Sequence, residues 1–189
     1  MKGPIMSLTG WEVNRTWTLF LDRDGVINRR IVDGYVTRWE EFEFLPGVLD
    51  ALKIMARHFG RIIVVSNQQG IAKGIMTEED LDRIHSSMIR QIEGARGRID
   101  LVLHSPHLSS EGSPMRKPGI GMAVEAKKMF PEIDFEKSIM AGDSESDMLF
   151  GRNAGMKTVL ISPDPELTEQ LNGTFDSVYP DLISFAEKF

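Results

Sequence analysis

The chain has 189 residues, of which 41% are hydrophobic and 26% charged, so it is long enough for one buried core and too apolar for a disordered chain. Its formal net charge of −6 argues against nucleic acid or an anionic membrane surface as the main partner. The absence of cysteine excludes disulfides and thiolate metal ligands, and no apolar run suits a membrane span or signal peptide, which indicates a cytoplasmic protein.

The first predicted elements are two buried strands separated by a helix. Residues 17–21 are apolar and β-prone, and this run stops at Asp22. Apolar residues then recur at helical spacing after Pro46 and Gly47. Residues 61–65 form a continuous β-branched run, which is typical of a strand buried on both faces.

The same alternation continues through the middle of the chain. Thr77 and Asp80 form a capping box, and the helix that it begins is expected to run through Ile92. A strand is predicted over residues 99–104. Residues 105–118 are rich in Ser, Pro and Gly without a period, which predicts a loop.

The C-terminal part repeats strands and helices in shorter units. The predicted elements are a helix at 119–130, a strand at 137–141, a helix at 147–154 that ends at Gly155, strands at 157–161 and 177–179, and a last helix from Asp181. This order predicts an α/β fold, a doubly wound parallel sheet with helices on both faces. We expect one domain over residues 1–189, with an N-terminal arm or edge strand at 1–15.

Polar residues follow four of the predicted strands. They are Asp22 and Asp24, Ser66 and Asn67, Arg116 and Lys117 after a longer loop, and Asp143 with Asp147. In an open α/β sheet, ligands bind at the carboxyl ends of the strands. We therefore expect all four groups to face one crevice.

The acidic residues of this crevice predict a magnesium site. Carboxylates packed together repel one another unless a cation binds between them, and Mg²⁺ is the hard ion that prefers such oxygens. The expected ligands are the carboxylates of Asp22 and Asp143 and the backbone carbonyl of Asp24. Asp147 has three open roles: it caps a helix, it orients the metal ligands, or it orients Lys117.

The same crevice contains the groups that phosphoryl transfer requires. Asp22 is the predicted nucleophile and forms an aspartyl-phosphate. Asp24 is the predicted acid and base, which protonates the leaving oxygen and then activates water. Lys117 would neutralise the phosphoryl oxygens, and Ser66 and Asn67 would donate hydrogen bonds to them.

These motifs resemble those of the haloacid dehalogenase (HAD) superfamily of phosphatases. The resemblance rests on Asp22-Arg-Asp-Gly-Val, Ser66, Lys117 and Gly142-Asp143-Ser-Glu-Ser-Asp147, in the same order over residues 17–162. Three segments also resemble the subfamily of the D,D-heptose 1,7-bisphosphate and histidinol-phosphate phosphatases. They are the residues from Asp22 through Asn28, Ser66-Asn-Gln-Gln-Gly70 and Arg116-Lys-Pro118. The resemblance implies a Rossmann-like fold, a Mg²⁺ requirement and a small phosphorylated substrate, a heptose bisphosphate first and histidinol phosphate second.

Four side chains are the candidates for substrate contacts. They are Asn28, Asn67, Gln68 and Arg116. The segments between Asp22, Ser66 and Lys117 are too short to hold a helix, a strand and a large cap domain. The site is therefore expected to be open to water, which favours hydrolysis over a mutase or phosphotransferase reaction.

One loop departs from the subfamily pattern. The subfamily usually holds a structural zinc with ligands spaced Cys-x-His and Cys-x-Cys, and the matching positions here are Ser105, His107, Ser113 and Met115. Serine and methionine are weak zinc ligands, so we expect no structural zinc. Prolines and local hydrogen bonds are expected to order the loop instead.

A non-catalytic phospho-acceptor module, such as a receiver-like domain, is the alternative function. It also places aspartates and a lysine at strand ends. A hydrolase needs an acid and base two residues after the nucleophile, and Asp24 occupies that position. We expect a monomer.

Overall fold

The computed structural model describes residues 10–189, with six strands and six α-helices in this part of the chain. The strands are β1 (Thr18–Leu21), β2 (Arg61–Asn67), β3 (Leu101–Ser105), β4 (Ser138–Gly142), β5 (Lys157–Ile161) and β6 (Ser177–Tyr179). The helices are α1 (Val48–His58), α2 (Glu78–Gly94), α3 (Gly121–Met129), α4 (Glu145–Ala154), α5 (Pro165–Gln170) and α6 (Leu182–Ala186).

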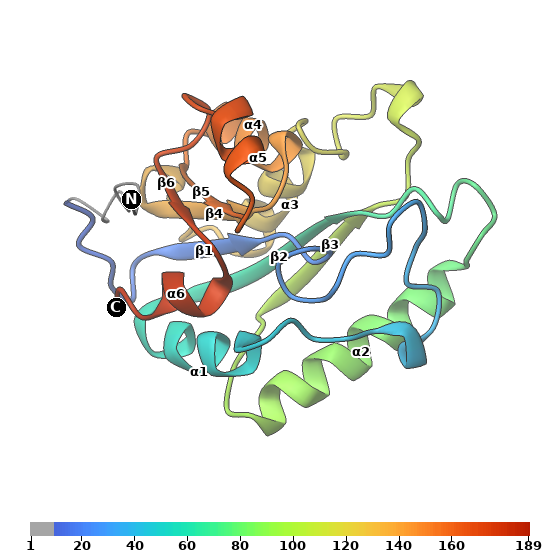
Figure 1. Cartoon of the computed structure of the whole chain (residues 1–189), viewed down its shortest axis with the longest axis horizontal. Coiled ribbons are helices and arrows are strands. Elements are labelled where there is room, and N and C mark those ends of the chain that lie inside the picture. The colour runs from blue at the N-terminus through green and yellow to red at the C-terminus, as the bar shows by residue number, and fades with distance from the viewer. Residues whose placement is uncertain (1–9) are drawn as a thin grey trace.

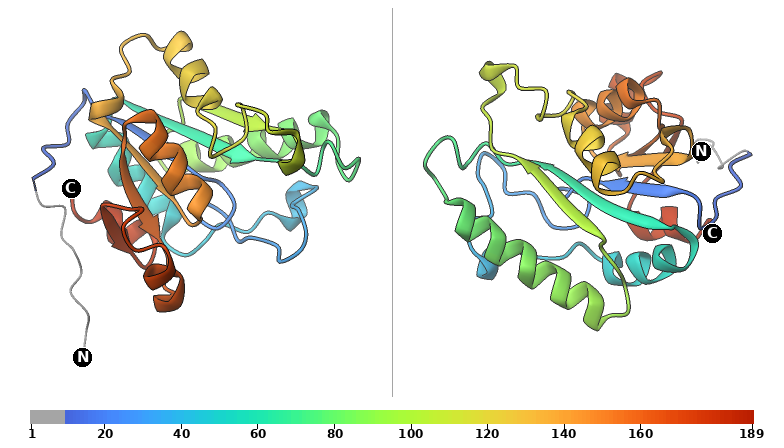
Figure 2. Two further views of the ribbon diagram at one scale, coloured as in Figure 1. Left: turned by 90° about the horizontal axis from the view of Figure 1, so that it is seen from above. Right: turned by 180° about the vertical axis from the view of Figure 1, so that it is seen from behind.

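The strands form one parallel sheet in the order β3-β2-β1-β4-β5-β6, with helices on both faces (Figure 1). Helices α1, α2 and α6 cover one face, and α3, α4 and α5 cover the other (Figure 2). Side chains alternate along each strand, so Leu19 and Leu21 of β1 pack into the core beneath α1, while Phe20 packs beneath α3 and α4. This confirms the predicted doubly wound fold.

The sheet has a topological switch point between β1 and β4, at its centre. From β1 the chain moves outward to β2 and β3, and it then returns to place β4 on the other side of β1. The loops that leave β1 and β4 therefore diverge toward opposite faces and open a crevice between them. Asp22 follows β1 and Asp143 follows β4, so the reversal places both residues at this crevice.

Several predicted boundaries differ from the observed ones. β2 extends through Asn67, because Ser66 and Asn67 pair with β3. α4 begins at Glu145 with Ser144 as its N-cap, and the carboxylate of Asp147 accepts hydrogen bonds from the backbone nitrogen of Ser144 at 3.1 Å and from its hydroxyl at 2.6 Å. The helix predicted over 119–130 is α3 (Gly121–Met129). The capping box at Thr77 and the left-handed cap at Gly155 are confirmed.

The sequence also predicts an N-terminal arm, a single domain and the absence of a large cap. The N-terminal arm is partly outside the described residues, and the part that is described, residues 10–15, has no helix or strand. The single domain over 1–189 stays a prediction. Between β1 and α1 and between β2 and α2, the described chain has turns, the 3₁₀ turn Trp39–Glu41 and two isolated β-bridges, so no large cap is present there. None of the helices in residues 10–189 has the length and apolar character of a bilayer-spanning segment.

Candidate active site

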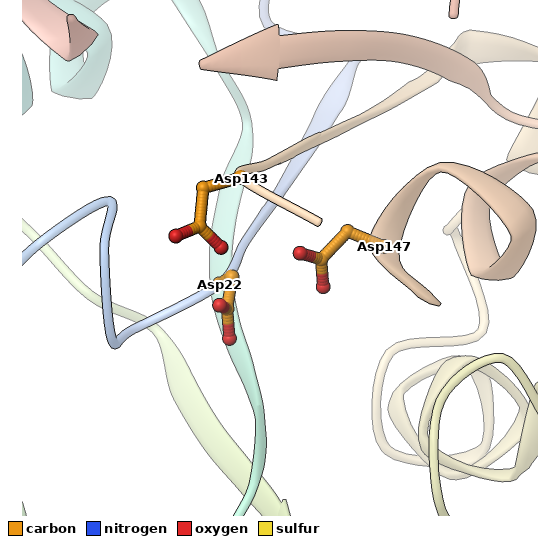
Figure 3. Close-up of side chains that lie close together, drawn as sticks. All are labelled: Asp22, Asp143 and Asp147. Carbon is orange, nitrogen blue, oxygen red and sulfur yellow. The ribbon is translucent and has the colours of Figure 1, made fainter. Parts of the chain in front are cut away.

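Three carboxylates meet at the crevice between β1 and β4. Asp22 and Asp143 follow these strands, and Asp147 comes from the first turn of α4. Their side chains point toward one another (Figure 3), and one oxygen atom from each carboxylate lies within 4.8 Å of those of the other two. Asp22 and Asp147 are buried, and Asp143 is partly exposed. The sheet topology thus builds a compact acidic cluster.

Two glycines allow the carboxylates to approach the backbone so closely. A side chain at Gly25 would overlap the carboxylate of Asp143, and the φ of +99° at this position also favours glycine. A side chain at Gly142 would overlap the side chain of Asp147. These positions therefore need glycine for the cluster to form.

Lys117 supplies the buried positive charge of the cluster. Its ammonium group lies 2.8 Å from Oδ1 of Asp22 and 2.6 Å from Oδ1 of Asp147, and it donates a hydrogen bond to the carbonyl oxygen of Val65. The side-chain amide of Asn67 bonds both backbone groups of Lys117, at 3.0 Å and 3.1 Å. The strand end of β2 therefore fixes the long loop that carries Lys117.

The cluster is short of positive charge. Burial raises the pKa of Asp22 to about 6, and the negative charge of Asp147 adds to this rise. The ammonium group of Lys117 acts in the opposite direction but does not cancel it. Burial also raises the pKa of Asp143 to about 8, with the charges of Asp22 and Asp147 adding to it. Although burial alone would lower the pKa of Lys117, the carboxylates of Asp147 and Asp22 raise it. A divalent cation would supply the missing charge.

The oxygen atoms expected to bind Mg²⁺ face a common point. The guanidinium of Arg30 marks that point, because its Nη2 lies 2.7 Å from Oδ1 of Asp143 and 3.0 Å from the backbone oxygen of Asp24. The same nitrogen is 3.9 Å from Oδ2 of Asp22. Two carboxylates and a carbonyl around one cationic group are the donor types that Mg²⁺ takes in proteins. The residues present therefore fit the ion.

Asp24 is oriented by three hydrogen bonds to its carboxylate. Oδ1 accepts from Nη2 of the fully buried Arg23 at 3.0 Å and from Asn28 at 2.9 Å, and Oδ2 accepts from Gln68 at 2.8 Å. Burial alone would raise the pKa of Asp24, but the charge of Arg23 and these hydrogen bonds hold it below its ordinary value. Asp24 is therefore ionised and fixed in direction.

A cavity of about 580 Å³ opens above the acidic cluster. Its lining includes the predicted residues Asp22, Asp24, Ser66, Asn67, Gln68, Arg116, Lys117 and Asp147. Asn28 is fully buried and is not among the described residues that line this cavity. Its contact with Asp24 supports a positioning role in place of the predicted substrate contact. The Nε2 of Gln68 also donates to Oγ of Ser66 at 2.7 Å.

The outer wall of the cavity contains residues that the sequence analysis did not single out. Arg30, Tyr35 and Lys73 lie on loops and line the cavity together with Arg116. Nζ of Lys73 donates to the Tyr35 hydroxyl at 3.0 Å. We call these four residues the rim. We call Asp22, Lys117 and Asp147, together with the adjoining Asp143 that is not among the lining residues, the floor. No sequence pattern marked the three new rim residues, because their loops are placed by tertiary contacts.

The loop that departs from the subfamily pattern is held by hydrogen bonds. Oγ of Ser105 and Nδ1 of His107 lie 3.1 Å apart, and the backbone nitrogen of Met115 donates to Oγ of Ser113 at 3.3 Å. The guanidinium of Arg116 donates to the carbonyl of His107 at 3.2 Å. These contacts tie the loop to the rim of the cavity.

Comparison with known proteins gives the family. The HAD-hydrolase-like family model matches residues 114–184. The D-glycero-α-D-manno-heptose-1,7-bisphosphate 7-phosphatase of Mycobacterium tuberculosis is 40% identical over 170 residues, which are 90% of each chain. The enzyme of that name from Campylobacter jejuni is 36% identical over 175 residues, 92% of this chain and 98% of the relative.

The chain belongs to the HAD-like phosphatases. The crystal structure of D,D-heptose 1,7-bisphosphate phosphatase from B. bronchiseptica, complexed with magnesium and phosphate, superposes with a TM-score of 0.82 at 28% identity. The match covers 91% of this chain and 97% of the other. This HAD-like chain is a phosphoric monoester hydrolase, which decides against the receiver-like alternative.

Proposed function

We propose that this chain is a Mg²⁺-dependent phosphatase that hydrolyses D-glycero-D-manno-heptose 1,7-bisphosphate at the 7-position. The reaction passes through an aspartyl-phosphate on Asp22. The observation that carries the proposal is the pairing of Asp22, buried beside Lys117, with Asp24, which three side chains hold in one direction. Relatives named 7-phosphatases of this sugar, which span the chain, support the substrate.

The first half-reaction transfers the phosphoryl group to the enzyme. A carboxylate oxygen of Asp22 forms a bond to phosphorus as the bond between phosphorus and the sugar oxygen breaks. Asp24 gives that sugar oxygen a proton. Asp24 therefore has to take up a proton when the substrate binds, and a negatively charged phosphate beside a carboxyl group favours its protonated form.

The second half-reaction returns the enzyme to its starting state. Ionised Asp24 takes a proton from water, and the water oxygen attacks phosphorus. The bond between phosphorus and Asp22 breaks, inorganic phosphate leaves, and the Asp22 carboxylate is restored. Lys117 stabilises negative charge on the Asp22 carboxylate and on the transferring group in both halves.

The magnesium site belongs to the same proposal. The carboxylates of Asp22 and Asp143 and the carbonyl of Asp24 would hold the ion, and Asp147 would orient Lys117. When bound, Mg²⁺ supplies positive charge that neutralises the phosphoryl oxygens. Ser66 and Asn67 line the cavity and are the proposed hydrogen-bond donors to the phosphoryl group.

The test is phosphate release from both anomers of heptose 1,7-bisphosphate and from histidinol phosphate. Each substrate is assayed with Mg²⁺ and with EDTA, for the wild type and for Asp22→Asn. We expect Mg²⁺-dependent turnover of a heptose anomer, and a loss of at least about 10⁴-fold in kcat for Asp22→Asn, as for other nucleophile substitutions. A preference for histidinol phosphate would overturn the substrate, and full activity of Asp22→Asn would overturn the mechanism.

A further inference from the structure

Arg30 occupies a position that phosphoryl transfer alone does not explain. Its guanidinium contacts the carboxylate of Asp143 at 2.7 Å and the backbone oxygen of Asp24 at 3.0 Å through Nη2 and at 3.3 Å through Nε. Oδ2 of Asp22 lies 3.9 Å from the same Nη2. One side-chain cation thus faces all three groups that are proposed to bind Mg²⁺.

A metal ion and this guanidinium exclude each other from these oxygens. Mg²⁺ binds its oxygen ligands at about 2.0–2.1 Å in near-octahedral geometry and keeps several water molecules. An Nη2 atom within hydrogen-bond distance of two of these oxygens occupies the space that the ion and its waters need. The lone pairs that bind the metal are also those that accept the arginine hydrogen bonds.

We propose that Arg30 is the internal counter-cation of the metal site. It neutralises and holds together the Asp22, Asp24 and Asp143 oxygens while no ion is bound, and Mg²⁺ must displace it in order to bind. Arg30 therefore sets the affinity of the site for divalent cations. This inference rests on the magnesium site of the proposed function.

The surroundings of Arg30 suit a side chain that leaves its position. Half of its side-chain surface is exposed, whereas the Asp22 side chain that it faces is only 7% exposed. The two residues that follow it, Ile31 and Val32, are 37% and 84% exposed, so this part of the loop packs against little. Displacement of the guanidinium thus requires a change of rotamer at the surface and leaves the buried floor intact.

The adjacent residue Arg29 differs from Arg30 in what its guanidinium contacts. Arg29 makes a two-point contact with the carboxylate of Glu43, at 2.9 Å and 3.0 Å, on the protein surface. Both side chains of that pair are more than 60% exposed. Arg29 thus has the same chemistry and the same loop but no contact with the proposed metal ligands, which makes it the matched control.

The test measures Mg²⁺ binding without substrate, by isothermal titration calorimetry, on the wild type, Arg30→Gln and Arg29→Gln. We expect Arg30→Gln to bind Mg²⁺ roughly tenfold more tightly, the equivalent of about 1.4 kcal/mol, because the ion no longer displaces a cation. Arg29→Gln should bind like the wild type. Loss of a merely structural contact would leave the affinity unchanged or weaken it.

Thermal unfolding provides a second readout. Without Mg²⁺, Arg30→Gln should unfold at a lower temperature than the wild type, because the carboxylates lose a counter-charge. With saturating Mg²⁺, the difference should disappear. Arg30→Lys, which keeps the charge, should lie between the two in both Mg²⁺ affinity and metal-free unfolding temperature.

The outcomes separate this inference from the proposed function. If the wild type binds no Mg²⁺, the proposed magnesium site fails and the inference fails with it. If the wild type binds Mg²⁺ and Arg30→Gln binds it equally or more weakly, the inference is overturned while the magnesium site stands.

Discussion

The floor and the rim of the cavity are built on different principles. The side chains of Lys117 and Asp147 in the floor are 2% and 0% exposed, and they are fixed by strand ends and a helix cap. Rim residues lie on loops, and Lys73 and Arg30 are exposed. The sheet therefore fixes the reacting groups, and the loops present groups that can adapt to a substrate. A substitution of Lys117 in the floor should lower kcat, and a substitution of Arg116 in the rim should raise KM.

Among substitutions that compare the floor with the rim, Lys117→Met is expected to have the largest effect. This change removes the buried ammonium that contacts both Asp22 and Asp147, while it keeps the length of the side chain. We expect kcat to fall by about 10²–10³-fold, the usual cost of removing one group that stabilises transition-state charge. Steady-state kinetics on the preferred bisphosphate measures it.

The control for this change is Lys128→Met on α3, where the lysine is exposed and pairs with Glu125. It should leave kcat and KM unchanged. Thermal unfolding with Mg²⁺ checks that Lys117→Met is folded. A folded Lys117→Met with wild-type kcat and a raised KM would show that the floor and the rim do not divide the work in this way.

A smaller effect is expected from Arg116→Gln in the rim. Arg116 is partly buried, burial lowers its pKa from the ordinary value, and its guanidinium is held by the carbonyl of His107. We expect it to bind the phosphate that is not cleaved, and its loss to raise KM for the bisphosphate about tenfold, as one charge-assisted contact is lost. kcat should change by less than about threefold.

Two comparisons sharpen the result for Arg116. A heptose 7-phosphate, which lacks the second phosphate, should show the same KM with the wild type and with Arg116→Gln. Arg83→Gln, which breaks an exposed pair with Glu79 on α2, should change neither constant. An equal rise of KM for both substrates would assign Arg116 to the phosphate that is cleaved.

The sequence predicted most of the fold because hydrophobic runs and caps are local signals. The parallel sheet followed from alternation, and the cap at Thr77 from two side chains. α5 (Pro165–Gln170) was missed although Asp164 caps it and proline begins it, because six residues show less than two helical turns of pattern. The shifted start of α4 came from Ser144, a cap that pairs with Asp147.

The floor was predictable from the sequence and the rim was not. The carboxyl ends of parallel strands meet at one edge of the sheet, so the sequence alone groups Asp22, Lys117 and Asp143. Arg30 depends on the path of a loop that carries no repeating pattern. Amides were also ambiguous, because Asn28 matches a motif but its buried amide orients Asp24. The sequence names the residue in such a case, and only packing decides what it contacts.

The smallest effect is expected from a substitution of His85 in α2. This residue contacts Arg23, which in turn donates a hydrogen bond to Asp24. Nη1 of Arg23 lies 3.1 Å from Nε2 of His85. Arginine can only donate, so Nε2 accepts and the imidazole is neutral. Burial lowers the pKa of His85 to about 3, and the charge of Arg23 adds to this. Between this value and the ordinary pKa of about 6.5, the unfolded chain binds a proton that the folded protein does not.

The stability that His85 contributes is therefore present above about pH 6.5 and is lost as the pH falls, by about 2 kcal/mol at pH 5. His85→Gln keeps an acceptor for Arg23 but does not titrate. We expect its thermal unfolding temperature to fall less than that of the wild type between pH 7 and pH 5, with kcat at pH 7 nearly unchanged. If the unfolding temperatures of the two proteins fell equally between pH 7 and pH 5, His85 would not be the group that titrates. A large loss of kcat at pH 7 would instead mean that catalysis depends on the imidazole itself. The orientation of Asp24 through Arg23 would then need more than a hydrogen-bond acceptor at position 85.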